Sequence, residues 1–454
     1  MRICACISRE EDLSSAELEK ADLLELRLDL MGALPRRKPP LPFIATFHPD
    51  SAADADIEAV DAQRWASEMG ASCLDLDVNE ALLIDDSRIR IIRSWHDWEG
   101  TPDEQEILEI LETARGDVAK AAFQVHGVRD LLSLLRASRS FQKPRVLLGM
   151  GIMGQVTRLR PQALGSEFSY ASVGLATAPG QIALGELREF GADGIITGLI
   201  GHPIAHSLSP ALHREAFRST GLQGRYLLLD IPEGEDLQLL PEIMEGYSIT
   251  GLNVTMPHKV AIMDILDSID PLAEEAGAVN SIHWDGSALH GHNSDLAGLE
   301  GSLLAAGVDL QGVSALLIGN GGAARAAATL LRRNDCELHV SARSPDRGRE
   351  FASEQGAEFI PVRSLAGRHF DLIINATPAG MRGEMPIPRE ALSPGQAVMD
   401  MIYRPRITPL LQAARDMGST VISGEEMLLR QAWEAFRIWT GREPDMAAMR
   451  EAMR

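Results

Sequence analysis

The chain has 454 residues, of which 45% are hydrophobic, and its formal net charge is −22. This length is too great for one hydrophobic core, so we expect two or three domains. The negative charge argues against nucleic-acid binding by bulk attraction, and no apolar run approaches the roughly 20 residues of a membrane span. We therefore expect neither a nucleic-acid partner nor a membrane.

The first residues, MRICACISREEDL, lack the basic and apolar regions of a signal peptide, so we expect a cytoplasmic location. The four cysteines (Cys4, Cys6, Cys73 and Cys336) are scattered, and we expect them to be reduced and buried. No His/Cys group has the spacing of zinc ligands, so we expect no metal. The sequence does not indicate an oligomeric state.

Residues 1 to about 190 alternate short apolar runs with amphipathic stretches. Eight runs predict strands: RICACI, LLELRLD, FIATF, CLDLDV, IRIIRSW, AAFQV, RVLLGM and SYASVGL. Helical patterns lie between most of them, so eight βα units predict a (β/α)8 TIM barrel over residues 1–192. Such barrels carry their chemistry at the downstream ends of the strands. The polar residues at those ends are Glu25, Arg27, His48, His96, Lys120 and Arg158.

A second α/β part begins after a short linker. We predict a substrate-binding lobe over residues 196–298, completed by helices in 425–454, with strands at GLIG, RYLLLD, GLNVT and AVNSIHW. A Rossmann domain is predicted over 299–424, because VSALLIGNGGAARAAATLLRR has the pattern of a strand, a glycine turn and a helix.

Lys120 and His96 form the first candidate catalytic set. A lysine whose pKa is lowered can attack a ketone and form an imine, which acidifies the adjacent carbon. A nearby imidazole moves protons in both directions near neutral pH. Arg27 and Arg158 can hold a carboxylate through paired hydrogen bonds. From the pattern alone, Lys120 could instead cap a strand, and His96 could be a core histidine.

This segment resembles type I 3-dehydroquinate dehydratase over nearly its whole length. The resemblance rests on ELRLD, SWHDW, the strand that carries Lys120, MGxxGQVTRL and ATAPGQ, in the family's order. It implies that Lys120 forms a Schiff base with the substrate ketone and that His96 is the general acid and base for the loss of water. It also implies a set of residues that bind the substrate's hydroxyls and carboxylate: Glu25, Arg27, Arg158, Thr177 and Gln181.

The chain departs from that family's pattern at three positions. The family usually has an arginine after the third strand, where this chain has His48 in TFHPD, so one substrate contact changes. A glutamate that normally follows has no clear equivalent in SAADAD. Thr177 replaces a serine and keeps the hydroxyl.

The glycine turn GNGGAA follows a predicted strand and opens a predicted helix. In that context a G-x-G-x-x-A turn places a pyrophosphate at the helix N-terminus. NAD enzymes carry an acidic residue at the end of the next strand, but here that strand ends VSARSPDR. Arg343, Ser344 and Arg347 suit a 2′-phosphate, so the sequence favours NADP (NADPH) over NAD.

Lys259 and Asp295 form the second candidate catalytic set. Such a pair can protonate and deprotonate a substrate oxygen while a nicotinamide exchanges hydride at carbon. A Lys/Asp pair is also often structural. Ser207 and Ser209 in HSLSP could bind a substrate or only cap the helix that follows.

The second part resembles shikimate dehydrogenase from end to end. The resemblance rests on GHPIAHSLSP, NVTMPHK, GAVN, GHNSD, IGNGGAAR, INATPAGM, DMIY and GEEMLLRQA. It implies that Lys259 and Asp295 are the catalytic pair. The substrate shell that it implies is Ser207, Ser209, Thr255, Asn280, Tyr403 and Gln431. The NADP cleft that it implies is lined by Gly319, Asn320, Gly321, Gly322, Ala323, Arg343, Ser344, Arg347, Asn375, Thr377, Met401 and Gly424.

This part also departs from its family. At the 2′-phosphate site the usual NRT is Ala342-Arg343-Ser344, which keeps the arginine and loses the asparagine. GEEM replaces GLGM and adds charge near the cofactor, and GHNSD replaces GDNTD without changing the aspartate.

The two resemblances together imply a bifunctional enzyme. It would dehydrate 3-dehydroquinate and reduce the resulting 3-dehydroshikimate to shikimate with NADPH. One alternative is a quinate-oxidising dehydrogenase that uses NAD, against which Arg343 and Ser209 argue. The other is a catalytically inactive, ligand-sensing protein, against which the presence of both Lys120 and Lys259 argues.

Overall fold

The structure is a computed structural model that describes residues 1–48, 57–234 and 236–453. These residues form two compact units. The first comprises Met1–Thr197, Gln223–Ile231 and Asp236–Ile249, and the second comprises Gly198–Leu222, Pro232–Glu235 and Thr250–Arg454. The domain boundaries inferred from the sequence remain a prediction.

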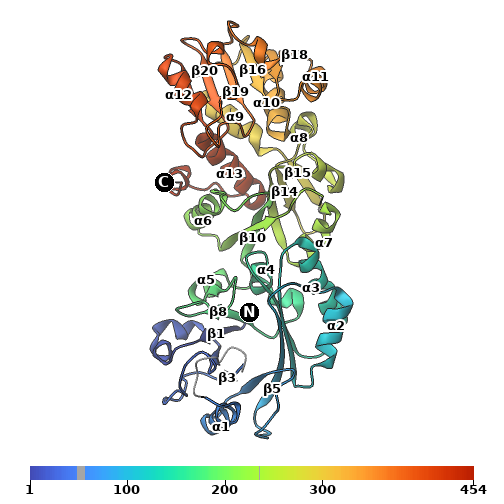
Figure 1. The fold of residues 1–454 in the computed structure, drawn as a ribbon, viewed down its shortest axis with the longest axis vertical. Helices are drawn as coiled ribbons and strands as arrows, with labels where there is room; N and C mark the ends of the chain where they lie inside the picture. Colours follow the sequence, from blue (N-terminus) through green and yellow to red (C-terminus); the bar gives the residue numbers. More distant parts are fainter. Residues whose placement is uncertain (49–56, 235, 454) are drawn as a thin grey trace. The chain divides into compact units, whose positions relative to one another are not determined.

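A parallel sheet in the first unit curls into a barrel (Figure 1). Its strand order is β7-β6-β5-β4-β3-β2-β1-β8-β9. The bounds are β1 Ile3–Ile7, β2 Leu23–Arg27, β3 Phe43–Thr46, β4 Cys73–Asp77, β5 Arg90–Asp97, β6 Val118–Gln124, β7 Arg145–Met150, β8 Ser169–Ser172 and β9 Ile182–Ala183. The ring closes where Arg145 bridges Ser166, just before β8. All eight predicted strands are confirmed.

The strand residues alternate between the barrel interior and its outer face, as the period of two requires. One cluster of buried side chains fills the interior, among them Cys4, Leu23, Ile44 and Val118. Lys120 lies two residues after Val118 on the same strand, so it points into the same interior, nearer the carboxyl ends of the strands. The apolar layer therefore forms the floor beneath the polar residues.

The helices of this unit follow only some of the strands. They are α1 Ala59–Met69, α2 Glu104–Thr113, α3 Val128–Ser140, α4 Gln155–Leu159 and α5 Leu184–Phe190, with α7 Leu240–Gly246 packed against α3. The predicted barrel is confirmed, but within the described ranges no α-helix follows β1, β2 or β4, and two 3-10 helices follow β1 instead. After β2, the prolines of GALPRRKPPLP remove backbone donors that a helix needs.

The second part of the chain begins with a mixed sheet of order β11-β10-β12-β14-β15-β13. Its strands are β10 Ile195–Gly201, β11 Gly224–Asp230, β12 Ile249–Val254, β13 Ser268–Ile269, β14 Ser281–Trp284 and β15 Leu289–His292. The helices are α6 Ser209–Thr220, α8 Pro271–Ala276, α9 Ser294–Ala305, α13 Gly424–Thr440 and α14 Met446–Glu451. Helix α13, near the end of the chain, packs closely on α9 and α6 (Figure 1).

A parallel sheet of order β18-β17-β16-β19-β20-β21 forms the predicted Rossmann domain (Figure 1). Its elements are β16 Ser314–Ile318, α10 Gly322–Arg333, β17 Glu337–Ser341, α11 Pro345–Glu354, β18 Glu358–Phe359, β19 Leu372–Asn375, β20 Ala397–Asp400, α12 Pro409–Asp416 and β21 Thr420–Ser423. Leu317 packs with α9 and α10 on one face, while Leu316 and Ile318 pack with α12 on the other. The strand order reverses between β16 and β19, which is where such sheets bind their ligands.

No helix in the described part of the chain is long and apolar enough to span a bilayer.

Candidate active sites

The side chain of Lys120 lies inside the barrel, where its Nζ faces two carboxylates. It donates to Asp75 Oδ2 at 2.6 Å and to Glu25 Oε1 at 3.3 Å, and it lies 4.8 Å from the centre of the Tyr170 ring. These four residues come from β6, β4, β2 and β8. In TIM barrels, alternate strands contribute the side chains of one interior layer, and this layer follows that rule. Lys120 is 5% exposed and Asp75 is fully buried.

The surroundings of Lys120 raise its pKa. Burial lowers that pKa, but the nearby Asp75 and Glu25 carboxylates outweigh burial and favour the ammonium form. The same ion pair holds the pKa of Asp75 at about 2, against the opposing effect of burial. The sequence-based premise of a lysine with a lowered pKa is therefore wrong for the ligand-free site. The reason is Asp75, a partner that was not among the predicted site residues.

His96 lies near the end of β5, between two aromatic rings. The His48 ring meets it edge to face, with centroids 5.1 Å apart, and the Trp98 ring stacks on it at 6.0 Å. Burial, assisted by the Lys120 charge and then by His48, lowers the pKa of His96 well below its ordinary value. His96 is therefore a neutral imidazole at neutral pH, which is the form that accepts a proton.

A cavity of about 340 Å³ joins these groups. Its lining includes every site residue predicted for the first part of the chain: Glu25, Arg27, His48, His96, Lys120, Arg158, Thr177 and Gln181. Thr177 and Gln181 are joined by hydrogen bonds from the Thr177 backbone N to Gln181 Oε1 (2.8 Å) and from Gln181 Nε2 to Thr177 Oγ1 (3.0 Å). The family's glutamate, which has no clear equivalent in SAADAD, falls at residues outside the described ranges.

Arg158 and Arg27 differ in how they are paired. The Arg27 guanidinium makes two hydrogen bonds to the Asp29 carboxylate, at 3.0 and 2.6 Å. Arg158 is only 2% exposed, donates to the backbone oxygen of Gly149, and leaves its Nε without a hydrogen-bond partner among the described residues. Burial lowers the pKa of Arg158 to about 10, which keeps it charged at neutral pH. A buried cation with an unused donor is a binding site for an anion.

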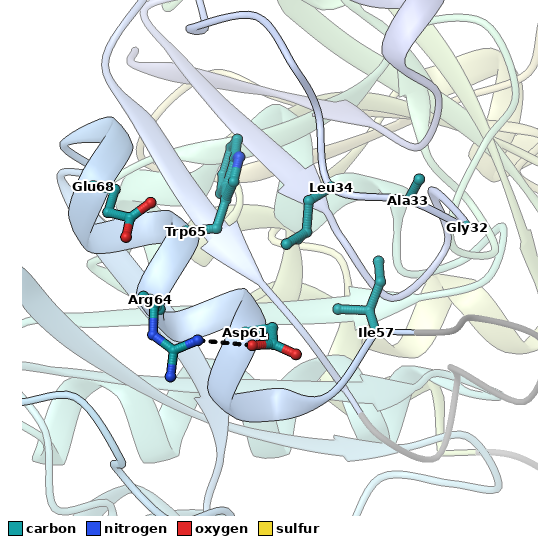
Figure 2. Close-up of a pocket in the computed structure, with 8 residues that line it drawn as sticks. All are labelled: Gly32, Ala33, Leu34, Ile57, Asp61, Arg64, Trp65 and Glu68. Carbon is teal, nitrogen blue, oxygen red and sulfur yellow. Dashed lines mark hydrogen bonds and ion pairs between the residues drawn. The ribbon is translucent and has the colours of Figure 1, made fainter.

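A larger cavity, of about 530 Å³, lies beside α1 and contains none of the predicted site residues (Figure 2). It is bordered by Trp65, whose indole donates to the Pro35 oxygen, and by an ion pair between Arg64 and Asp61. These interactions are local to the α1 surface, so we assign the chemistry to the smaller cavity.

The second predicted catalytic pair is in contact. Lys259 donates to Asp295 Oδ2, and Asn280 Nδ2 donates to the other carboxylate oxygen at 2.8 Å. Asn280 Nδ2 also reaches Gln431 Oε1 at 3.2 Å, and Asn280 Oδ1 accepts from the Ser294 backbone N at 2.7 Å. Lys259 follows β12, Asn280 precedes β14, and Asp295 and Gln431 lie on α9 and α13. Residues far apart in sequence thus form one hydrogen-bonded group.

The predicted serines lie at the start of α6. Ser207 Oγ accepts from the Ser209 backbone N at 3.2 Å. Burial raises the pKa of Tyr403, and the nearby Ser207 side chain opposes that rise. The helix begins at Ser209 without a side-chain cap from its N-cap residue, Leu208. Ser207 therefore helps to order the start of α6, which is the helix-capping role that the sequence also allowed. Its hydroxyl also lies near Tyr403. Thr255 follows β12, and its backbone N bonds to the Ile200 oxygen at 2.9 Å.

The glycine turn between β16 and α10 lies against Lys259. Gly319 has a φ of +123°, which favours glycine. A Cβ at Gly322 would lie 2.7 Å from Lys259 Cβ, whereas nothing lies within 4 Å of a Cβ at Gly321. Asn320 and Ala323 complete the turn. The open position at Gly321 is the one where a dinucleotide approaches the backbone in this motif.

Other predicted cofactor residues gather at the carboxyl ends of β19 and β20. Asn375 Oδ1 accepts from the Thr377 backbone N and hydroxyl, at 3.1 and 2.7 Å, and the Met401 N bonds to the Asn375 oxygen at 3.0 Å. A Cβ at Gly424 would lie 2.2 Å from the Met401 oxygen, so only glycine fits there. Asn375 Nδ2 donates to the Ala379 oxygen at 3.0 Å and to Asp400 Oδ1 at 3.1 Å, and Asp400 is a buried carboxylate that sequence reasoning did not identify.

Arg343 and Ser344 are exposed between β17 and α11, and Arg347 is exposed in the first turn of α11. No ion pair engages either arginine within the described ranges, and no acidic side chain stands at the tip of β17. Within the same ranges, no cluster of His, Cys, Asp or Glu is arranged to hold a metal ion.

In comparisons with known proteins, the two parts of the chain match different protein families. The family described as type I 3-dehydroquinase matches residues 3–191, the shikimate dehydrogenase substrate binding domain matches 199–282, and the shikimate 5'-dehydrogenase C-terminal domain matches 424–454. The NADP(+) shikimate dehydrogenase of Rubrobacter xylanophilus is 42% identical over 57% of this chain and 95% of that protein.

The chain belongs to the shikimate dehydrogenase family, with a type I 3-dehydroquinase domain fused to it.

The chain is also similar to a bifunctional relative and to a solved structure of these families. The chloroplastic bifunctional 3-dehydroquinate dehydratase/shikimate dehydrogenase of Arabidopsis thaliana is 29% identical, over 95% of this chain and 79% of that protein. The crystal structure of Thermus thermophilus shikimate 5-dehydrogenase in complex with NADP(H) and shikimate is 38% identical. It covers 57% of this chain and 98% of its own, with a TM-score of 0.53.

Proposed function

We propose that Lys120 and His96 dehydrate 3-dehydroquinate and that Lys259 and Asp295 serve the NADPH-dependent reduction of 3-dehydroshikimate to shikimate. The chain is thus a bifunctional enzyme of the shikimate pathway, a dehydratase and an NADP-dependent dehydrogenase. The observation that carries the proposal is the pairing of a lysine with a carboxylate in each part of the chain: the buried Lys120 with Asp75, and the partly buried Lys259 with Asp295.

In the first site, the Lys120 ammonium must lose a proton before its nitrogen attacks the ketone, and the neutral His96 imidazole is a base in the same cavity. The amine then adds to the carbonyl carbon, and water leaves as the iminium forms. His96 removes the proton next to the iminium carbon and passes it to the departing β-hydroxyl, which leaves as water. A second water hydrolyses the iminium and returns Lys120. The net reaction releases one water.

The remaining residues of the cavity hold the substrate in this scheme. Arg158, with its unused donor, takes the substrate's carboxylate. Glu25, Arg27, Thr177 and Gln181 offer donors and acceptors for the hydroxyls. Asp75 holds Lys120 in place and keeps it charged until the ketone arrives.

The residues of the second site fit NADP. The turn at Gly321 leaves room for a pyrophosphate at the start of α10, and Arg343 and Arg347 are free to meet a 2′-phosphate. When bound, the nicotinamide supplies the reducing equivalent. Lys259 gives a proton to the substrate's carbonyl oxygen as charge develops there, and Asp295 orients Lys259 through their ion pair. Asn280 fixes Asp295 and also donates to Gln431. In this scheme these amides meet the substrate hydroxyls, with Ser207, Ser209, Thr255 and Tyr403 around the rest.

Three further points belong to this proposal. The catalytic domains span residues 1–192, 196–298 with 425–454, and 299–424. The ligands are 3-dehydroquinate, 3-dehydroshikimate, shikimate and NADP, with no nucleic acid or membrane among the partners. The location is the cytoplasm, although the Arabidopsis relative is chloroplastic.

A coupled assay on single variants tests the proposal. The assay follows 3-dehydroquinate to shikimate with NADPH, and each half-reaction is also measured alone. We expect Lys120→Ala to abolish dehydration and keep reduction, and Lys259→Ala to do the reverse. Borohydride with 3-dehydroquinate should attach the substrate to the Lys120 peptide. Loss of both activities in either folded variant, or an unlabelled Lys120 peptide, would contradict the assignment.

A further inference from the structure

His48 lines the dehydratase cavity from the end of β3, half-buried, and faces His96 edge to face at 5.1 Å. The charged groups that act on it come from three strands or their ends: Arg27, Asp29, Asp75 and Lys120, with His96 as the other titratable neighbour. Among the described residues, His48 therefore stands inside the charge network of this site.

The charges of the described cavity lean toward the negative side. The cations are Arg27, Lys120 and Arg158. The carboxylates that line the cavity or pair with these cations are Glu25, Asp29, Asp75 and Asp77. A substrate that carries a carboxylate adds another negative charge to a cavity with no surplus of cations to meet it. Arg158 offers one cation to that carboxylate, and a proton that enters with the anion adds a second positive charge.

The two imidazoles are not equivalent as acceptors of that proton. For His96, the charge with the largest effect is the Lys120 ammonium, which opposes a second cation. For His48, the charge with the largest effect is the Asp75 carboxylate, which favours a cation, although burial still lowers the pKa of His48 below its ordinary value. His48 is thus neutral in the free site and lies where added negative charge favours protonation.

We propose that His48 takes up one proton from solvent when 3-dehydroquinate binds and supplies, beside Arg158, a second cation for the substrate's carboxylate. This inference rests on the dehydratase function proposed for the barrel. His48 would act on substrate binding, while Lys120 and His96 perform the chemistry. Binding would then weaken as pH rises, because taking up a proton becomes less favourable when the proton concentration is lower.

The test is the pH dependence of KM and kcat for 3-dehydroquinate between pH 6 and 8.5. In the wild type, KM should rise by up to about tenfold for each pH unit, the limit for uptake of one proton, and kcat should not follow that rise. His48→Arg carries a permanent charge, so its KM should stay flat across this range. His48→Gln carries none, so its KM should be high and flat.

Two controls separate the possible failures. Reduction of 3-dehydroshikimate by the same preparations reports whether each variant is folded. His369→Arg adds the same charge at an exposed residue of the Rossmann domain and should keep the wild-type KM profile. A flat wild-type KM, or the same rise in KM in His48→Arg or His48→Gln, overturns the role of His48 while the dehydratase function stands. Absence of wild-type turnover at every pH overturns the proposed function itself.

Discussion

Replacing Gly322 with alanine tests whether the glycine turn fixes the position of Lys259. The added Cβ would lie 2.7 Å from Lys259 Cβ and 3.0 Å from its Cδ. Carbon atoms pack at about 3.5–4.0 Å, so the alanine needs roughly 1 Å more space. The closest atom is bonded to the Lys259 backbone, so a rotation at the end of the lysine side chain does not relieve the overlap. The lysine must move relative to Asp295.

A displacement of about 1 Å in a catalytic group can cost about 100-fold in rate. We therefore expect Gly322→Ala to lower kcat for 3-dehydroshikimate reduction by about 100-fold, or about 2.7 kcal/mol of activation free energy. The loss of NADPH absorbance measures this rate. Dehydration of 3-dehydroquinate by the same preparation should be unchanged, which shows that the chain is folded.

Gly321→Ala is the matched comparison, because no described atom lies within 4 Å of its Cβ and its φ of −89° suits alanine. We expect it to raise KM for NADPH, since its Cβ would point where the dinucleotide approaches, and to keep kcat at saturating NADPH near the wild-type value. If Gly322→Ala keeps the wild-type kcat, the reasoning about Lys259 is refuted.

Two further predictions follow from the buried ionisable groups. Asp75→Asn removes the nearer carboxylate of Lys120 and so lowers the pKa of that lysine. Because Lys120 must lose a proton to react, the pH at which kcat/KM for dehydration rises to half its maximum should fall by about one to three units. An unchanged pH profile would show that Asp75 does not hold the proton on Lys120. Burial lowers the pKa of His213 to about 3, so the folded state leaves it neutral while the unfolded state binds a proton below about pH 6.5. The free energy of unfolding therefore decreases as pH falls, by about 2 kcal/mol between pH 6.5 and 5 from this group alone. In urea unfolding, the decrease for His213→Gln over the same range should be smaller by that amount. An equal decrease in both proteins would contradict the prediction.

The strands of the barrel were predictable because each is a short apolar run with turn residues around it. The missing helices were not, because the chain between β2 and β3 carries enough prolines to prevent a helix without shifting the strands. The strands β13 and β15 also escaped prediction. They are short and carry polar residues such as His290 and Ser268, so no apolar period marks them.

The predicted members of the barrel site converge on one cavity because parallel strands end at one edge. Asp75 was missed, although CLDLD carries a signal for it: Asp75 and Asp77 share a face, and an acid in a barrel strand needs a buried cation. The contact between Asn280 and Gln431 has no local signal at all. It joins residues 151 positions apart, and only the packing of α13 on α9 brings them together.

That long-range contact has a consequence for how the protein is made. At roughly 5–20 residues per second, the ribosome adds Gln431 roughly 8–30 s after Asn280. Trp439, whose indole donates to the Ile282 oxygen at 2.9 Å, arrives later still. During that interval the nascent lobe holds Asn280 and β14 without α13 to cover them. The barrel strands and cavity residues, in contrast, are all synthesised before residue 192, so the first catalytic site can assemble while the second still waits for its last helix.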